Sequence, residues 1–173
     1  DDASVGGDLT VTGTVNTAGI TGPKTNFVGS MLISNDAGTG TLDAASNNTG
    51  FGNEVFDDLT SGDSNTGVGA QALAKLTSGS DNVAIGFSAL ENVSTGIQNT
   101  AVGKDAENSV TTGNYNIAVG YHALEGTTTG SNNVAIGRAA LEANTTADDN
   151  TAVGFAALEA NTTGANNVAV GRD

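Results

Sequence analysis

The 173-residue chain contains no cysteine and no tryptophan, and it has one proline and one histidine. The absence of cysteine excludes a disulfide framework and leaves the redox compartment open. Aromatic residues make up only 4% of the chain, so a core built on large side chains is not expected. The apolar residues that are present are mainly small or β-branched, which suits thin, stacked β-coils.

Basic residues are also scarce. Five Lys and Arg stand against 19 Asp and Glu, which gives a formal net charge of −14. Nucleic acid is therefore not expected as a partner, because binding to phosphates needs clustered basic side chains. The negative charge favours solubility and discourages long particles from sticking side by side.

Long apolar runs are missing too. No stretch approaches the roughly 18 apolar residues that span a bilayer, and no signal peptide is visible, so membrane insertion is not expected. The chain begins with Asp1 rather than Met and stops at Asp173, two residues after a repeated glycine. We therefore expect a fragment or a processed piece of a longer protein.

What the chain does contain is a repeat: an asparagine recurs with a constant 17-residue period, and a glycine follows each one four positions later. The asparagines are Asn48, Asn65, Asn82, Asn99, Asn116, Asn133, Asn150 and Asn167, and the glycines are Gly52, Gly69, Gly86, Gly103, Gly120, Gly137, Gly154 and Gly171. A disordered acidic chain would have no reason to keep such a register. Each unit is therefore expected to be one structural step that stacks on its neighbours.

Three zones follow from this pattern. Residues 1–29 include the alternating run 8–12, which predicts a short strand of a β fibre shaft or linker. Residues 30–46 are expected to form a lead-in or capping coil, and residues 47–173 carry the regular repeat. Since a unit of this length is too short for a strand plus a full helix, the sequence predicts an all-β parallel solenoid, or β-roll, with two short strands and a loop per coil.

The residues between asparagine and glycine alternate in size, as in Val83-Ala84-Ile85. The β-branched residues share one face of the predicted strand, and the other face carries nothing larger than a methyl group. We expect this methyl face to be left for a partner chain.

Further along each unit, an Ala-Leu pair is expected to fill the inside of the coil. Glu107 replaces the leucine in one unit, which predicts a less well-packed coil that Val110 compensates. Most units close with a glycine, interpreted as a turn residue with positive φ. Ala147 occupies this position in one unit, where strain is expected.

Equivalent positions in a solenoid form columns along the stack. The column directly after the anchor glycine alternates aromatic and cation: Phe87, Lys104, Tyr121, Arg138, Phe155 and Arg172. At a coil spacing of about 4.8 Å, each exposed pair is worth about 0.5–1 kcal/mol. The favoured interpretation is an exposed packing ladder, with a ligand-contacting stripe or a contact to a neighbouring chain as alternatives.

Two further columns are regular. The column five positions after the glycine is mostly acidic and contains Asp57, Glu91, Glu125, Glu142 and Glu159. Its repulsion could be offset by water and salt, by Arg138 and Arg172 of an adjacent chain, or by Ca²⁺, although the known calcium-loop patterns are absent and no metal or cofactor is predicted. The eight asparagines are expected to form an amide ladder in which each side chain bonds the next coil.

The sequence does not predict an enzyme. His122 occupies a variable column, which indicates an exposed site rather than a ligand or a base, and neither a nucleophile motif nor a phosphate-binding loop is present. A glycan-cleaving enzyme would need paired carboxylates in a groove, whereas Glu142 and Glu159 belong to one ladder. An ice-binding solenoid is a further alternative, but adjacent threonines do not share one flat face.

The repeat resembles two related kinds of protein. Residues 82–86 and 133–137, both Asn-Val-Ala-Ile-Gly, resemble the Val-Ala-Ile-Gly repeats of trimeric autotransporter adhesin heads. The fuller unit at residues 150–164 is similar to a variant found in bacteriophage tail-fibre proteins. Residues 6–14 resemble the short strands of phage fibre shafts, and residues 29–42 resemble the lead-in to such rolls.

The resemblance implies a left-handed β-roll in which three identical chains pack around an axis, although the coils of adhesin heads are shorter than the unit in this chain. It implies a structural and adhesive segment of a phage tail fibre, located extracellularly on the virion. The implied partners are neighbouring fibre or tail proteins and a host cell-surface glycan or protein. The alternative is the head of a bacterial trimeric adhesin at the cell surface.

Overall fold

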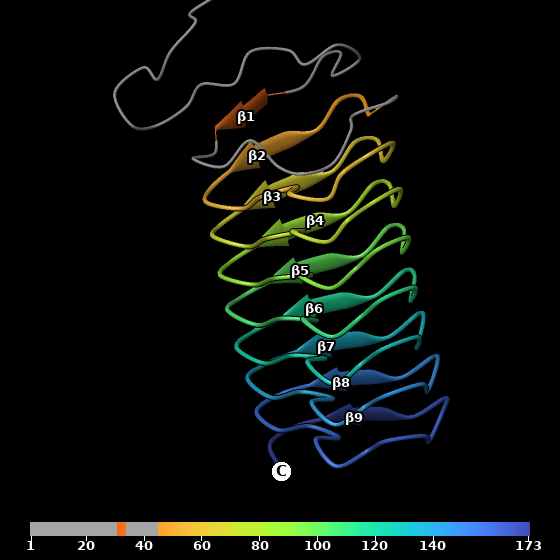
Figure 1. Ribbon diagram of the computed structural model, residues 1–173. Coiled ribbons are helices and arrows are strands. Elements are labelled where there is room, and N and C mark those ends of the chain that lie inside the picture. Colours follow the sequence, from red (N-terminus) through yellow and green to blue (C-terminus); the bar gives the residue numbers. More distant parts are fainter. Residues whose placement is uncertain (1–30, 34–44) are drawn as a thin grey trace, which may run out of the picture.

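The computed structural model describes residues 31–33, for which only the backbone is considered, and residues 45–173. These residues form an all-β solenoid whose nine strands build one parallel sheet in chain order (Figure 1). The strands are β1 (Met31–Ile33), β2 (Thr49–Phe51), β3 (Thr66–Val68), β4 (Val83–Ile85), β5 (Thr100–Val102), β6 (Ile117–Val119), β7 (Val134–Ile136), β8 (Thr151–Val153) and β9 (Val168–Val170). No helix among the described residues is long and apolar enough to cross a membrane.

The repeat period of the sequence is the register of the sheet. From β2 onward every strand pairs with the equivalent residues of the next repeat, as in Val83 with Thr100. The first step is one residue longer, because Met31 pairs with Thr49. The predicted shaft at residues 1–29 and most of the predicted lead-in coil at 30–46 lie outside the described residues, so both stay predictions.

Each coil contains one three-residue strand rather than the two strands that we expected. After each strand from β2 to β8, two non-glycine residues have left-handed backbone angles, for example Gln71 with φ of 61° and Leu73 with φ of 56°. These angles end the extended conformation, but the coils remain hydrogen-bonded to each other, as where Leu73 N donates to Ala89 O at 3.1 Å. The rest of the coil is therefore turn structure that still stacks.

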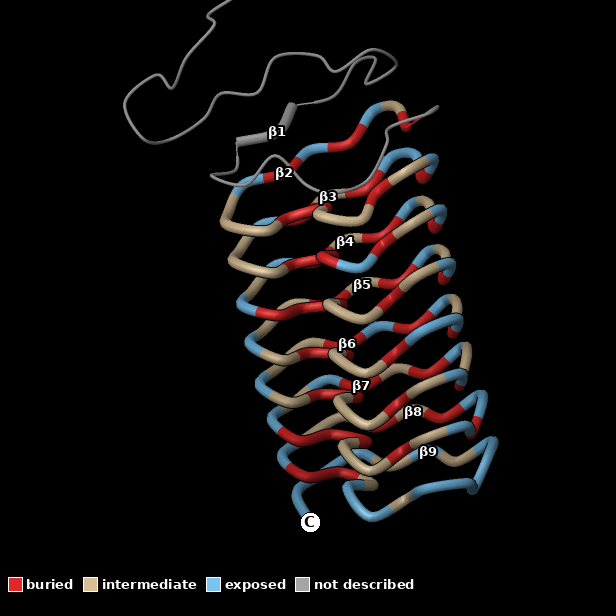
Figure 2. The backbone as a smooth tube through the Cα atoms, in the orientation of Figure 1, coloured by how far each residue is buried: buried red, intermediate tan, exposed pale blue. Residues whose placement is uncertain are grey.

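The interior of the roll contains two columns of larger apolar side chains. The predicted leucine column is confirmed, since Leu73, Leu90, Leu124 and Leu141 are fully buried. A second apolar column, which the sequence did not lead us to expect, lies three positions before the closing residue of the first four coils and contains the buried Leu59, Leu76, Val93 and Val110. Val110 therefore continues this column and is not a specific compensation for Glu107. In the next two coils the same position holds the buried polar residues Thr127 and Asn144. Buried segments recur at the same places from coil to coil along the stack (Figure 2).

The prediction that the methyl face is left for a partner is wrong. Ala84, Ala101, Ala118, Ala135 and Ala152 are fully buried inside the single chain. The reason is that the roll is thin, so these small side chains pack directly against the opposite side of the same coil or of its neighbour. Gly67 occupies the alanine position of its strand and faces Val55. A Cβ added to Gly67 would lie 2.8 Å from Val55 Cγ1, so even an alanine would not fit there. The β-branched residues consequently point outward, and Ile85 and Ile136 remain about two-fifths exposed (42% and 41%).

Candidate functional site: ladders along the roll

The repeated asparagines connect each coil to the next through the backbone. In the middle of the stack, Asn82 Oδ1 accepts a hydrogen bond from Asn99 N at 2.9 Å, while Asn82 Nδ2 donates to Gly96 O at 2.8 Å. The first of these bonds recurs at every step from Asn48 to Asn167. The predicted amide ladder is present at five of the seven steps, for example Asn65 Nδ2 to Asn48 Oδ1 at 3.0 Å. The Asn82 side chain thus bonds a backbone N–H of the next coil and the carbonyl of a closing residue. Both groups lie outside the strands, so the sheet itself would leave them unpaired.

The anchor glycine has two reasons to be glycine. Gly103 has a φ of 141°, a region that L side chains rarely adopt. A Cβ at this position would also lie 2.5 Å from the carbonyl oxygen of Gly120 in the next coil. The close approach of the next coil and the positive φ therefore both require glycine at this position.

The closing glycine has a different role from the one that we expected. Positive φ is absent at this column among the described residues, so Ala147 carries no strain of that kind. Glycine is needed because of close packing: a Cβ at Gly96 would lie 2.5 Å from Gly113 O and 2.8 Å from Val93 Cγ2.

At Ala147 the hydrogen-bond pattern of the next coil differs instead. Asn150 Nδ2 donates to Asp148 O at 3.2 Å and not, as the repeat would require, to Gly164 O. Asn161 Nδ2 donates to the carbonyl of Gly164 at 2.9 Å. The coil that carries the alanine is therefore followed by a break in the asparagine pattern.

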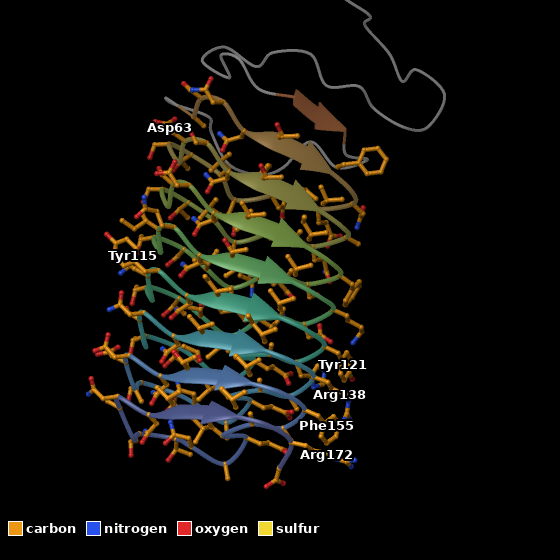
Figure 3. All side chains as sticks on the ribbon, turned by 180° about the vertical axis from the view of Figure 1, so that it is seen from behind. Asp63, Tyr115, Tyr121, Arg138, Phe155 and Arg172 are labelled. Carbon is orange, nitrogen blue, oxygen red and sulfur yellow. The ribbon has the colours of Figure 1, made fainter. Side chains whose placement is uncertain are left out.

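The aromatic–cation column forms a continuous series of cation–π contacts on the surface. Lys104 Nζ lies 5.6 Å from the ring centre of Phe87 and 5.3 Å from that of Tyr121. The guanidinium of Arg138 lies 5.7 Å from Tyr121 and 5.1 Å from Phe155, and that of Arg172 lies 5.0 Å from Phe155. Figure 3 shows Tyr121, Arg138, Phe155 and Arg172 along one edge of the sheet, and Tyr115 along the opposite edge. The rings stay exposed, so the column is both a packing ladder and an accessible surface.

The acidic column has its own contacts within the chain. Glu91 Oε2 accepts a hydrogen bond from Asn108 Nδ2 at 3.1 Å. The carboxylates of Glu125 and Glu142 face the ring of His122, whose side chain is only 24% exposed and not the open surface group that we expected. Asp105 contacts both this ring and Lys104. The hydrogen bond that the Lys104 ammonium group donates to Asp105 raises the pKa of Lys104.

Glu107 is a carboxylate enclosed in the interior of the roll. It occupies the leucine column and is fully buried, with Oε1 accepting a hydrogen bond from Asn116 Nδ2 at 2.7 Å. Its other oxygen, Oε2, has no hydrogen-bond partner. Burial raises the pKa of Glu107 to about 8. The carboxyl group thus occupies a site where the neighbouring coils have a leucine, and one of its oxygens is unpaired. That this coil is weaker than its neighbours stays a prediction.

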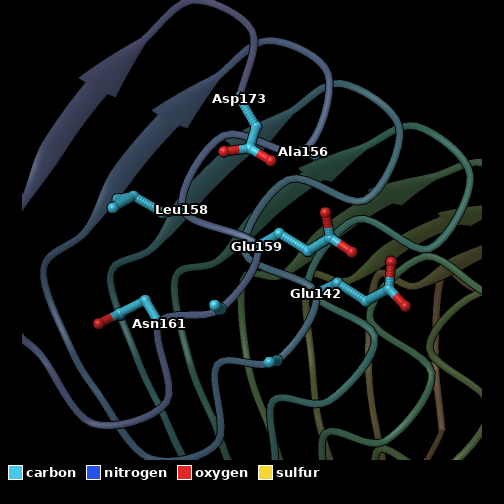
Figure 4. Close-up of a pocket in the computed structure, with 8 residues that line it drawn as sticks. Glu142, Ala156, Leu158, Glu159, Asn161 and Asp173 are labelled. Carbon is cyan, nitrogen blue, oxygen red and sulfur yellow. The ribbon is translucent and has the colours of Figure 1, made fainter.

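A hollow of about 660 Å³ lies at the last coil (Figure 4). Its lining includes the carboxylates of Glu142, Glu159 and Asp173 together with Leu158, and it includes no basic residue. Glu142 and Glu159 come from the same position of adjacent coils and lie side by side (Figure 4). This arrangement differs from the two carboxylates on opposite sides of a bond that glycoside hydrolysis requires.

Comparison of the chain with protein-family models, with curated proteins and with solved structures finds no match. The function must therefore be inferred from the stack itself.

Proposed function

We propose that this chain is a rod segment of a homotrimeric extracellular fibre, most specifically a bacteriophage tail fibre. In this role it holds or presents a host-binding surface. The observation that carries the proposal is the outward face of the sheet, which is long, regular and free of charge. Its two rows contain Thr49, Thr66, Val83, Thr100, Ile117, Val134, Thr151 and Val168, and Phe51, Val68, Ile85, Val102, Val119, Ile136, Val153 and Val170.

The distribution of charge supports a self-complementary partner for this face. The chain carries 19 acidic residues, yet none lies in these strands. The face extends over about 34 Å for seven steps of about 4.8 Å. Twelve of its sixteen residues are apolar and the other four are threonines, and monomeric soluble proteins rarely expose large contiguous apolar patches. A homotrimer around one axis would bury it on all three chains.

The stacking supports a mechanical role. Backbone hydrogen bonds, the asparagine bonds and the cation–π series all run along the same axis. Such a rod resists bending and repeats the same surface at each coil, which suits many weak contacts with a host glycan or protein. A left-handed roll is expected from the likeness to adhesin heads.

The head of a bacterial trimeric adhesin is the second candidate. Two units, 82–86 and 133–137, carry the Asn-Val-Ala-Ile-Gly pattern that resembles those heads. The longer coil of this chain favours the phage fibre, because the adhesin coils are shorter. Immunogold labelling with antibodies against the chain distinguishes the two: label on the tails of virions supports the fibre, and label on the surface of uninfected cells supports the adhesin.

The trimer is tested by the mass of the protein in solution. We expect about three times the chain mass of 16.9 kDa from light scattering. Replacing Ile85 and Ile136 together by Glu places charges on the exposed face and should give monomers. Tyr115→Glu is the matched control, since Tyr115 is similarly exposed (51%) but lies outside the strands, and this variant should remain trimeric. A monomeric wild-type protein would contradict the proposal.

A further inference from the structure

The single histidine of the chain is held between carboxylates of three successive coils. His122 follows Tyr121, and the two rings stack with centroids 3.7 Å apart and an interplanar angle of 20°. The backbone of His122 has a φ of 57°, in the left-handed region. The ring is thus fixed at the edge of the roll, between the preceding coil and the next one.

The two ring nitrogens have different surroundings. Nδ1 lies 2.9 Å from Glu125 Oε2 in its own coil and 4.0 Å from Glu142 Oε1 in the next coil. Nε2 lies 3.5 Å from Asp105 Oδ2 in the preceding coil. An outer carboxylate on the second ring nitrogen is the arrangement that orients metal-binding histidines and makes them more basic.

The separation of these atoms fits a small divalent cation. One ligand atom from each of His122, Glu125 and Glu142 lies within 4.8 Å of the other two. In a tetrahedral zinc site with bonds of about 2.0–2.2 Å, neighbouring ligand atoms lie about 3.4 Å apart. The two distances from Nδ1 fall on either side of this value, so small side-chain rotations would close the site.

We propose that His122 Nδ1, Glu125 and Glu142 bind one Zn²⁺ ion, with water at the remaining position, and that Asp105 orients the imidazole. The imidazole nitrogen favours Zn²⁺ over Ca²⁺ and Mg²⁺, which prefer oxygen ligands only. The rest of the acidic column has no such nitrogen, since His122 is the only histidine. The ion would connect two adjacent coils along the axis of the rod. The proposal does not depend on the phage or adhesin role.

The test uses the chain without a polyhistidine tag, treated with a chelator and then titrated with Zn²⁺ by calorimetry. We expect one ion per chain. Because His122 is the only histidine, the ¹⁵N signals of its ring in a histidine-labelled sample report on this site directly. Zn²⁺ should shift the Nδ1 signal strongly and raise the melting temperature.

Variants separate a built site from general attraction to an acidic surface. Asp105→Asn should weaken Zn²⁺ binding by about tenfold, in line with losses for the outer partners of metal ligands. His122→Ala removes a ligand itself and should therefore weaken binding by more than about 100-fold, beyond the range for outer partners. Glu91→Gln removes a carboxylate from the same column two coils away and should leave binding unchanged within about twofold. Circular dichroism of each variant verifies that the roll is intact.

Three results would overturn the proposal. These are equal Zn²⁺ affinity in the His122→Ala variant, Ca²⁺ or Mg²⁺ binding as tight as Zn²⁺ binding, or no shift of the histidine signals in an excess of Zn²⁺ over the chain. None of these results bears on the oligomeric state, so failure here and failure of the proposed trimer are distinguishable.

Discussion

Asn116 Nδ2 donates a hydrogen bond to Glu107 Oε1 at 2.7 Å in the interior of the roll. The same nitrogen donates to Gly130 O at 2.8 Å, so one amide serves both the repeated asparagine pattern and the carboxyl group. Leu90 and Leu124 occupy the place of Glu107 in the adjacent coils. A single Leu-to-Glu difference thus puts a titratable group into an otherwise apolar column.

We predict that this carboxyl group makes stability depend on pH. The pKa of Glu107 is about 8 in the folded chain against 4.5 for an ordinary glutamate, because burial disfavours the charged form. Between these values the folded chain binds more protons than the unfolded chain, so stability falls as pH rises. The stabilisation of the folded chain that comes from the raised pKa of Glu107 is fully present below pH 4.5. It is lost as pH rises through about 8. The loss between about pH 5 and 8 is on the order of 3 kcal/mol.

The measurement is the melting temperature of wild type and Glu107→Gln from about pH 5 to 8.5. The wild type should lose stability relative to the variant across this range. Glu107→Leu should also remove the pH dependence and, by filling the column with an apolar side chain, should be the most stable of the three at about pH 8. Glu91→Gln, a change on the surface of the roll, should keep the wild-type slope. Parallel curves for wild type and Glu107→Gln would show that this group does not titrate as predicted.

We predict that Asn99→Ala destabilises the roll by about 2–4 kcal/mol, because it leaves the buried N–H of Asn116 and the carbonyl of Gly113 without their side-chain partners. Each unpaired buried group costs about 1–3 kcal/mol. Chemical denaturation measures the loss. Asn167→Ala is the matched control, because Asn167 is only partly buried and no later asparagine in the chain bonds to its Oδ1. If Asn167→Ala lowers the free energy of unfolding as much as Asn99→Ala does, the hydrogen bonds from the asparagine side chain to the next coil are not the source of the stabilisation.

We predict that Gly96→Ala destabilises the roll by about 2 kcal/mol or more. Its Cβ would lie 2.5 Å from Gly113 O and 2.8 Å from Val93 Cγ2, and backbone has to move to relieve the overlap. The neighbouring Thr95→Ala, at an exposed site, should change stability by no more than about 0.5 kcal/mol. Urea denaturation of both variants measures the difference.

The reverse change, Ala147→Gly, should be nearly neutral. The hydrogen bond between Asn150 and Gly164 that it allows is worth about 0.5–1.5 kcal/mol, which offsets the entropic cost of a glycine of about 0.5–1 kcal/mol. Thermal denaturation of the Gly96→Ala and Ala147→Gly variants side by side checks this asymmetry. A strong stabilisation by Ala147→Gly would instead indicate that Ala147 is strained.

Much of the fold followed from spacing. The 17-residue separation of Asn82 and Asn99 is also the separation of Val83 and Thr100, which pair in the sheet. A repeat without insertions predicts coils that stack one on the next. The buried position of Leu90 and the alternating contacts around Arg138 also followed, because equivalent residues of adjacent coils become neighbours.

Other features could not be predicted because they depend on distances across the coil. Alternation in Val83-Ala84-Ile85 indicates two faces but not which one points inward; the close approach of Val55 to Gly67 decides this. The need for glycine at Gly96 comes from an oxygen in the next coil, whereas its own φ is ordinary. His122 looked like a variable surface residue because its own column also holds uncharged residues such as Ser88 and Ala139. Its contacts with Glu125 and Glu142 join two different columns, which spacing within one column does not reveal.

The sequence by itself determined a parallel β-solenoid with one coil per repeat, since an uninterrupted period dictates which residues become neighbours along the axis. Only the tertiary structure decided which face of each strand is free for a partner and which carboxylates surround the histidine. Both depend on packing across the thin interior and on side-chain directions. The period places Asp105 one repeat before His122, but it does not show that Glu125 and Glu142 turn toward the imidazole.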